Sequence, residues 1–146
     1  MSTVLLKCCL LIVAFLFGDL FFLRSNDDDL PESMKRGEEV YLGNCMSCHM
    51  YSGEGLYGTY PPLANTSYMS DDPQRSINII LQGQKEEVII NDTIYYSEMP
   101  AQDYLTDEQI ADVLNYVMNS WGNKAPILTS DLVKTERNKM SNENKD

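Results

Sequence analysis

Residues 45–49 are Cys45-Met46-Ser47-Cys48-His49, two thiols three positions apart followed at once by an imidazole. This Cys-x-x-Cys-His spacing is the attachment signature of a c-type haem. On one turn of helix both cysteines face the same side, so each can form a thioether to a haem vinyl group while His49 gives a ring nitrogen to the iron. The motif therefore predicts one covalently bound haem c held by Cys45, Cys48 and His49.

Three other interpretations of this motif are a disulfide, a redox Cys-x-x-Cys pair and half of a zinc site. A zinc site needs further Cys or His ligands, yet His49 is the only histidine, and the other cysteines, Cys8 and Cys9, lie in an apolar N-terminal run. A thioredoxin-type pair needs a βαβ context, whereas the residues around Cys45 have the pattern of a helix. The haem interpretation is therefore favoured.

The chain has 146 residues, enough for one small domain with appendages. Its 22 acidic residues outnumber its 11 basic residues, and its formal net charge is −11. This balance argues against nucleic acid or an anionic membrane surface as a binding partner. A basic partner would suit the charge, but acidity is also common on proteins without a charged partner.

Residues 1–24 are expected to form a signal peptide or an uncleaved membrane anchor. The run over residues 4–23 is mostly apolar, approaches the length that crosses a bilayer and has no small-x-small cleavage site, which favours the anchor. Lys7 lies on its N-terminal side and acidic residues follow at 27–29, so the N-terminus is expected inside and the rest outside. Because bacteria attach haem covalently outside the cytoplasm, the domain is expected on the periplasmic side of the inner membrane, anchored or soluble. Residues 25–32 are interpreted as an acidic linker.

A first helix is predicted at about residues 33–45, capped by Ser33 or Glu32. Gly37 lies inside it and costs about 1 kcal/mol relative to alanine. Close packing of another helix against Gly37 would explain this choice, and an incidental glycine is the alternative.

A last helix is predicted over residues 106–121, where Thr106 and Gln109 match a capping box. Apolar residues then recur at helical spacing: Ile110, Val113, Leu114, Val117 and Trp121. A short helix capped by Thr129 or Ser130 is expected next. From residue 138 the composition is polar, so residues 138–146 are predicted to be a disordered tail, and the domain is assigned to residues 33–137.

Between these helices the pattern predicts one more helix and a hairpin. Acidic residues at 71–72 followed by Pro73 predict a helix start, and Gly83 predicts its end. Residues 88–90 and 93–96 are two short β-rich runs around an Asn-Asp turn, which indicates a small β-hairpin.

The loop after the haem motif contains Tyr60-Pro61-Pro62-Leu63. A haem-ligating histidine usually donates its other ring N–H to a backbone carbonyl, so Pro61 or Pro62 is a candidate acceptor for His49. Tyr60 and Leu63 would pack on the haem. A simple proline turn is the alternative interpretation.

A methionine thioether can complete the coordination of haem iron and raise its potential. Of the eight methionines, Met69 and Met99 are left once those beside the motif, at the N-terminal side, in the last helix and in the tail are set aside. Met99 lies in a loop, with Pro100 stiffening the next position, whereas Met69 lies in a polar stretch before a helix cap. Position therefore favours Met99 as the second iron ligand.

The order of these elements resembles the class I c-type cytochromes, in particular small bacterial monohaem cytochromes c. It is also similar to the cytochrome c domains fused to copper nitrite reductases or found in oxidase and dehydrogenase subunits. The likeness covers about residues 34–137 and is strongest in Pro-Pro-Leu-Ala at 61–64, in the Met-Pro at 99–100 and in Asn-Ser-Trp-Gly-Asn at 119–123. Met-Tyr-Ser at 50–52 departs from the small or acidic residues usual there, which affects the edge of the haem and not its ligation.

The resemblance implies an all-α class I cytochrome c fold, with crossed N- and C-terminal helices around one haem and a small β-hairpin as an insertion. By resemblance, Cys45 and Cys48 carry the haem, His49 is the proximal ligand and Met99 the distal ligand, and Pro61 is the acceptor for His49. The helices are expected to cross where Gly37 and Tyr41 meet Val113 and Tyr116.

The resemblance implies a one-electron carrier, not an enzyme, that serves a respiratory or other redox chain. Its expected partners are redox proteins (an oxidase, a reductase or a dehydrogenase), and the membrane if the N-terminal segment stays uncleaved. One alternative is a peroxidase-like haem enzyme or sensor with an open or labile distal site, which would require Met99 not to ligate. Another is a tethered electron-relay subunit of a larger oxidoreductase, which the N-terminal anchor supports.

Overall fold

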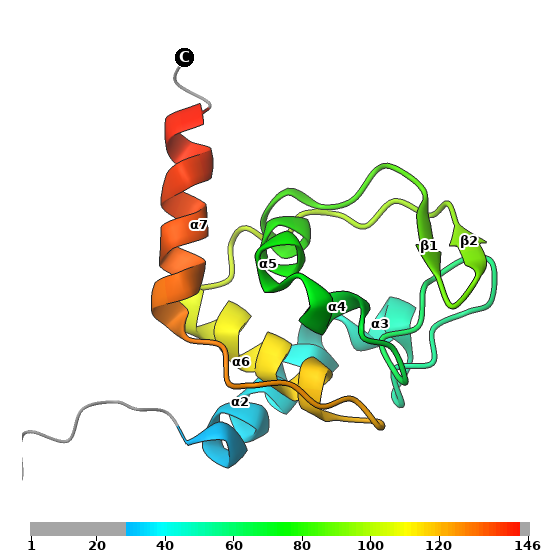
Figure 1. Ribbon diagram of the computed structural model, residues 1–146, viewed down its shortest axis with the longest axis horizontal. Coiled ribbons are helices and arrows are strands. Elements are labelled where there is room, and N and C mark those ends of the chain that lie inside the picture. Colours follow the sequence, from blue (N-terminus) through cyan, green and yellow to red (C-terminus); the bar gives the residue numbers. More distant parts are fainter. Residues whose placement is uncertain (1–28, 144–146) are drawn as a thin grey trace, which may run out of the picture.

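The computed structural model describes residues 29–143, so the expectations for residues 1–28 and 144–146 lie outside the described residues. The last three residues of the linker expected over residues 25–32 belong to a helix that begins at Leu30. The elements in chain order (Figure 1) are α2 (Leu30–Asn44), α3 (Met46–His49), α4 (Tyr68–Asp71), α5 (Pro73–Gln82), β1 (Val88–Ile90), β2 (Thr93–Tyr95), α6 (Asp107–Asn119) and α7 (Ser130–Glu143). The expected all-α architecture with one small hairpin is confirmed. Across residues 29–143, no helix combines the length and the apolar character needed to cross a membrane.

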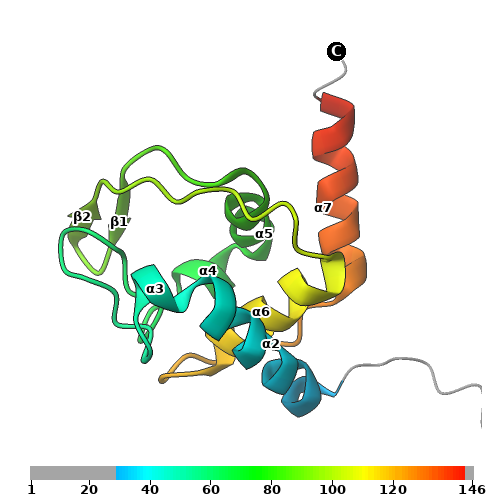
Figure 2. The ribbon, with the colours of Figure 1, turned by 180° about the vertical axis from the view of Figure 1, so that it is seen from behind.

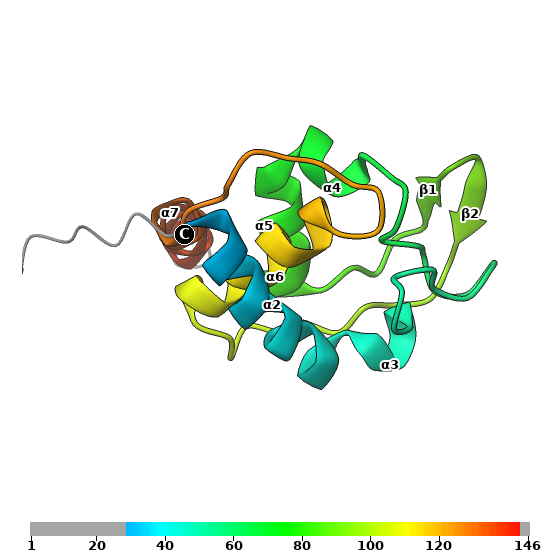
Figure 3. The same cartoon turned by 90° about the horizontal axis from the view of Figure 1, so that it is seen from below.

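Helices α2 and α6 cross in close contact, as Figures 2 and 3 show from two sides. A Cβ on Gly37 would overlap the backbone carbonyl of Asp112 and lie 2.9 Å from the Cβ of Tyr116. Tyr41 is fully buried at the same crossing, with its ring centroid 5.5 Å from that of Tyr116 and 5.1 Å from that of Trp121. The close approach expected at Gly37 is confirmed.

A buried carboxylate lies beside this crossing. Asp112 is 3% exposed; it accepts hydrogen bonds from Ser33 Oγ at 2.6 Å and from Arg36 Nε and Nη2 at 2.7 and 2.8 Å. The prediction that Ser33 or Glu32 caps α2 is therefore wrong. The helix begins three residues before Ser33, with Asp29 at the N-cap position and a proline in the first turn, because the Ser33 hydroxyl is needed inside the core.

Asn115 links this network to the segment that follows α6. Its side-chain amide donates to Ser33 Oγ and to the Leu128 carbonyl, both at 2.9 Å, and its Oδ1 accepts from the Leu128 N–H at 2.7 Å. All of these groups are buried, so each needs a partner. The network fixes the connection from α6 to α7 against the start of α2.

The predicted middle elements are present. Asp72 caps α5 by accepting from the Arg75 N–H at 2.9 Å, and Gly83 ends the helix with a φ of 78°. Strands β1 and β2 pair antiparallel with Ile89 opposite Ile94. Two successive left-handed residues, at positions 91 and 92, form the tight turn that matches the twist of a hairpin.

Two elements differ from expectation. Helix α4 (Tyr68–Asp71) begins in the polar stretch around Met69, where no helix was predicted before residue 71. Helix α7 continues to Glu143, so the predicted disorder from residue 138 is wrong for residues 138–143. The helix is held there because Met140 packs against the core and Lys139 Nζ lies 2.6 Å from Glu136 Oε1. Figure 1 shows α7 rising beside the rest of the domain.

Candidate haem-binding site

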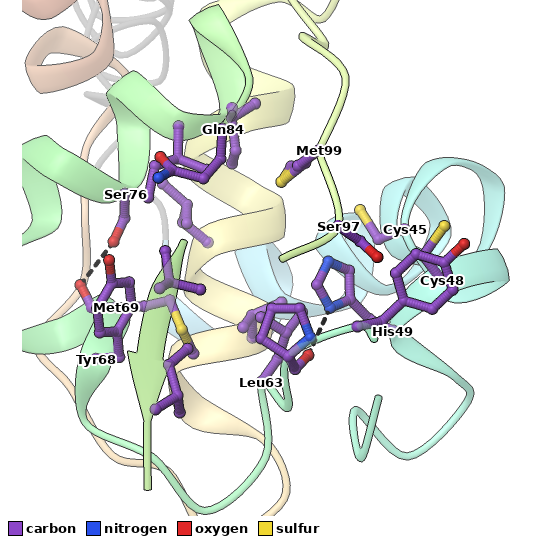
Figure 4. Close-up of a pocket in the computed structure, with 18 of the residues that line it drawn as sticks. Cys45, Cys48, His49, Leu63, Tyr68, Met69, Ser76, Gln84, Ser97 and Met99 are labelled. Atoms are coloured by element: carbon purple, nitrogen blue, oxygen red, sulfur yellow. Dashed lines mark hydrogen bonds between the residues drawn. The ribbon is translucent and has the colours of Figure 1, made fainter. Parts of the chain in front are cut away.

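One large apolar pocket lies among α3, α5, α6, the hairpin and the loop before α6 (Figure 4). The empty space inside it, including open solvent at its mouth, is about 1010 Å³. The lining includes every site residue named from the sequence: Cys45, Cys48, His49, Tyr60, Pro61, Leu63 and Met99. The fold therefore brings together residues from three separate segments.

His49 ends α3 and is 9% exposed. Its Nδ1 lies 2.9 Å from the carbonyl oxygen of Pro61, so a ring N–H there donates to that carbonyl and leaves the Nε2 lone pair free. Between the two prolines that the sequence left open, Pro61 is the acceptor. Burial lowers the pKa of His49, which outweighs the opposing effect of the Pro61 contact, and the neutral form that can bind a metal is favoured.

Gly55 explains how the Pro61 carbonyl reaches His49. The Gly55 N–H donates to the His49 carbonyl at 3.0 Å, and a Cβ on this glycine would lie 2.7 Å from the Pro61 oxygen. Gly55 also has a φ of 64°, which L-residues with side chains rarely adopt. The glycine-rich loop thus folds back tightly under the imidazole.

Cys45 lies directly before α3 and Cys48 lies within it, three positions later, and both are half-buried free thiols that line the pocket. Figure 4 shows their sulfur atoms on the same side of the His49 ring. Burial, with a smaller contribution from Cys48, raises the pKa of Cys45 to about 11. Because the thiolate is the nucleophile in disulfide exchange, a protonated Cys45 does not suit the redox-pair interpretation.

Met99 comes from the loop between β2 and α6, on the other side of the pocket from His49. Its backbone pairs with Gln84, with the two N–H···O distances 2.8 and 2.9 Å. Gly83 lacks the Cβ that would overlap the Met99 carbonyl. Figure 4 shows the Met99 sulfur directed into the space above the His49 ring. The loop is therefore held to the end of α5 with its thioether facing the imidazole.

Met69, the other methionine left open by the sequence, also lines the pocket. It is 7% exposed on α4, where its carbonyl accepts from Ser76 Oγ at 3.0 Å. Figure 4 shows it beside Tyr68, at the part of the pocket away from the cysteines. Met69 is more buried than Met99, whereas Met99 lies across the pocket from His49.

The remaining walls were not named from the sequence as parts of the site. They come from α4, α5 and the residues after it, the hairpin, the loop that follows it and α6, and comprise Tyr68, Ser76, Ile79, Ile80, Gln84, Val88, Ile90, Ser97, Glu98, Pro100, Val113, Leu114 and Val117. The helical spacing of 76, 79 and 80 and the alternation of 88 and 90 were signals that these residues share a face. They show only that a face is buried, not that it surrounds a cofactor.

The donor set of the pocket fits haem c. It offers two thiols on one turn, one imidazole with a free nitrogen and one thioether opposite it, within apolar walls. Within residues 29–143, no group of three or more His, Cys, Asp or Glu side chains could hold a metal ion by itself.

A family model described as Cytochrome c matches residues 34–121. The chain is 38% identical over 102 residues to the cytochrome c subunit of the quinone alcohol dehydrogenase of Gluconobacter oxydans, which covers 67% of this chain and 21% of that subunit. It is 29% identical over 119 residues to the gluconate 2-dehydrogenase cytochrome c subunit of Pantoea cypripedii, which covers 74% of this chain and 27% of that subunit. Cytochrome c-552 of Thermus thermophilus is 31% identical over 90 residues, 59% of this chain and 68% of that protein. The chain thus spans about a fifth of the length of the alcohol dehydrogenase subunits it matches.

Proposed function

The chain belongs to the cytochrome c family, which carries covalently bound haem c, and we propose that it transfers single electrons through one haem ligated by His49 and Met99. The observation that carries the proposal is the pocket in which an imidazole and a thioether face each other beside two thiols. When bound there, the haem supplies reversible one-electron chemistry between ferric and ferrous iron.

Each side chain has a distinct task in this proposal. Cys45 and Cys48 fix the haem as thioethers, so it is not lost when the iron changes oxidation state. The Pro61 carbonyl accepts from the His49 ring, holds its orientation and strengthens it as a ligand. The Met99 sulfur is a soft ligand that favours the ferrous state relative to a second histidine.

The apolar walls complete the site. Tyr60 and Leu63 contribute from the loop, and the branched side chains of α5, α6 and the hairpin close the other sides. These walls keep water from most of the iron's surroundings, which disfavours the more charged ferric state and raises the potential.

The proposed partners are other redox proteins: an oxidase, a reductase or a dehydrogenase. The hypothesis of a relay subunit is supported by relatives named cytochrome c subunits of alcohol and gluconate dehydrogenases. The proposed location is the periplasmic side of a bacterial inner membrane, with residues 1–24 as a signal peptide or an anchor. Co-purification with membranes supports the anchored form, whereas release as a soluble monomer supports the cleaved form.

The experiment that tests the ligation is the optical spectrum of the oxidised protein, searched for the weak long-wavelength band of methionine bound to ferric iron. Met99→Leu should abolish the band with little change in side-chain volume. Met69→Leu is the matched control, because Met69 lines the same pocket, and it should keep the band. A high-spin wild-type spectrum without the band would instead favour the haem enzyme or sensor with an open distal site.

A further inference from the structure

Exposed apolar side chains gather at one end of the domain. The described residues include nine exposed large apolar side chains, and six of them lie in two segments: Tyr51, Leu56, Tyr57, Ile89, Ile94 and Tyr96. The first segment is the loop after α3 and the second is the hairpin. Figures 1, 2 and 3 all place that loop and the hairpin at the same end of the molecule. Exposed apolar groups gathered in this way mark interaction sites more often than scattered ones do.

The hairpin has two apolar faces. Ile90 and Tyr95 point inward and are 4% and 5% exposed, and Ile90 lines the pocket together with Val88. Ile89 and Ile94 are paired across the strands on the outer face and are 61% and 40% exposed. Antiparallel strands commonly have one apolar face on the core and one polar face in water. The apolar outer face of this hairpin departs from that pattern.

Tyr96 continues the outward alternation beyond β2 and is 65% exposed. Ile89, Ile94 and Tyr96 are called the hairpin face below. The adjoining loop repeats the arrangement, since Tyr60 lines the pocket while its bridge partner Leu56 is half exposed. Both segments therefore separate the pocket from solvent by the thickness of a single chain layer.

Acidic side chains surround the hairpin face. Glu86 and Glu87 precede β1, Asp92 lies in the turn and Glu98 follows β2, and all four are exposed. Lys85 is the only basic residue between positions 85 and 98. A second copy of this chain would bring two acidic rims together, in molecules that each carry a net charge of −11. Repulsion between like charges therefore argues against self-association.

We propose that the hairpin face is the docking site for a redox protein whose contact surface has an apolar centre and a basic rim. The inference deepens the proposed function and rests on it, because an electron is exchanged only if the pocket holds a redox-active haem. The acidic rim attracts and orients the partner, and the isoleucine pair lets it approach without stripping water from charged groups. A partner seated there lies one strand away from the pocket wall formed by Val88 and Ile90.

The proposal can be tested with two tripositive oxidants that differ in their outer shell. Hexaamminecobalt(III) presents polar N–H groups, whereas tris(phenanthroline)cobalt(III) presents apolar aromatic faces; each cobalt(III) takes one electron from the ferrous haem and becomes cobalt(II). Stopped-flow traces of the reduced holoprotein give the second-order rate for each oxidant. The variant is Ile89→Thr with Ile94→Thr, which keeps β-branched residues on the strands. The matched control is Ile127→Thr, an exposed isoleucine outside the two segments.

For the double variant we expect about a tenfold lower rate with the phenanthroline complex and an unchanged rate with the hexaammine complex. The Ile127→Thr control should match the wild type with both oxidants. Glu86→Gln with Glu87→Gln should slow both reactions and weaken their dependence on salt, whereas Glu143→Gln on α7 should not. Circular dichroism of each variant establishes that the domain is still folded.

A double variant that reacts with both oxidants at the wild-type rates would overturn the docking site. A wild-type dimer in sedimentation that is absent in the double variant would also overturn the proposal, because the hairpin face would then bind a second copy of the chain. Failure of the proposed function gives a different result: the wild-type haem would not cycle between its ferric and ferrous states with either oxidant.

Discussion

Replacement of Gly37 by alanine tests whether the helix crossing sets the stability of this domain. The added methyl group would overlap the Asp112 carbonyl oxygen, lie 2.5 Å from its carbonyl carbon and lie 2.9 Å from the Tyr116 Cβ. Two of these three atoms are backbone of α6, so no rotamer change can relieve the overlap. Asp112 is also held by Arg36 and Ser33, which prevents α6 from shifting locally.

The expected effect follows from two opposing contributions. Alanine in place of glycine inside a helix stabilises by about 1 kcal/mol. Overpacking a core costs about 1–3 kcal/mol, and an overlap with backbone belongs at or above the upper end. The net loss is therefore about 2 kcal/mol, which lowers the melting temperature of a domain of this size by about 8 °C.

Gly43 in the same helix is the matched control, because a Cβ there would meet no atom within 4 Å. Gly43→Ala should leave the stability unchanged or raise it by up to about 1 kcal/mol. The assay is urea unfolding of the holoprotein followed by circular dichroism, with both variants measured beside the wild type. If Gly37→Ala is as stable as the wild type, or if both variants lose the same free energy, the reasoning from the crossing is refuted.

Three further outcomes follow from contacts elsewhere. Arg137 donates to the Leu105 carbonyl and to Asp107 Oδ1, both at 2.7 Å. Arg137→Gln should therefore loosen the attachment of the loop after Met99 and speed imidazole binding to the ferric haem, whereas Lys134→Gln on the same helix should not. Equal binding rates in the two variants would contradict this. Asp112→Asn should cost about 2 kcal/mol in urea unfolding, because it removes the charge of a buried carboxylate that accepts hydrogen bonds from Arg36 and Ser33. A loss below about 1 kcal/mol would show that this carboxylate is dispensable. Burial raises the pKa of Tyr41 above its ordinary value of 10.0, so the folded protein holds the phenol proton to higher pH than the unfolded chain does. The stabilisation from this difference is complete below pH 10 and is lost as the pH rises further. Tyr41→Phe should therefore reduce the fall of the unfolding free energy at alkaline pH, and an unchanged fall would assign the effect to another group.

Local signals predicted the parts of the fold that depend on neighbours in sequence. The capping box at Thr106 and Gln109 is present in both directions, and the left-handed turn at residues 91–92 closes the hairpin. The haem motif fixed which segment bears the candidate ligands, because its spacing is a chemical requirement rather than a packing preference. The contact between Pro61 and His49 also follows from a chemical requirement, because a metal-ligating histidine usually donates its other ring N–H to a carbonyl.

Signals that depend on distant partners were missed. Ser33 has the residue type of a helix cap, yet Asp112 lies 79 positions away and takes its hydroxyl. Residues 138–143 have a polar composition that indicates disorder, but Met140 packs against the core and the helix continues. The short helix α4 around Met69 was not predicted, because its N-cap residue makes no side-chain capping hydrogen bond. In each case a tertiary contact outweighed the local preference.

The polar network at the helix crossing also has a consequence for the order in which the domain assembles. Ser33 and Asp112 close a loop of 79 residues, at an entropic cost of about 4 kcal/mol. Contacts of such long range slow folding, because the entropy of loop closure is lost before the contact stabilises the chain, and this contact forms only when α6 meets α2. Until then the cysteines of the haem motif, which follow directly after α2, have no opposite wall of the pocket over them. Slow closure of the chain ends would therefore lengthen the interval in which these thiols are accessible for attachment of the haem.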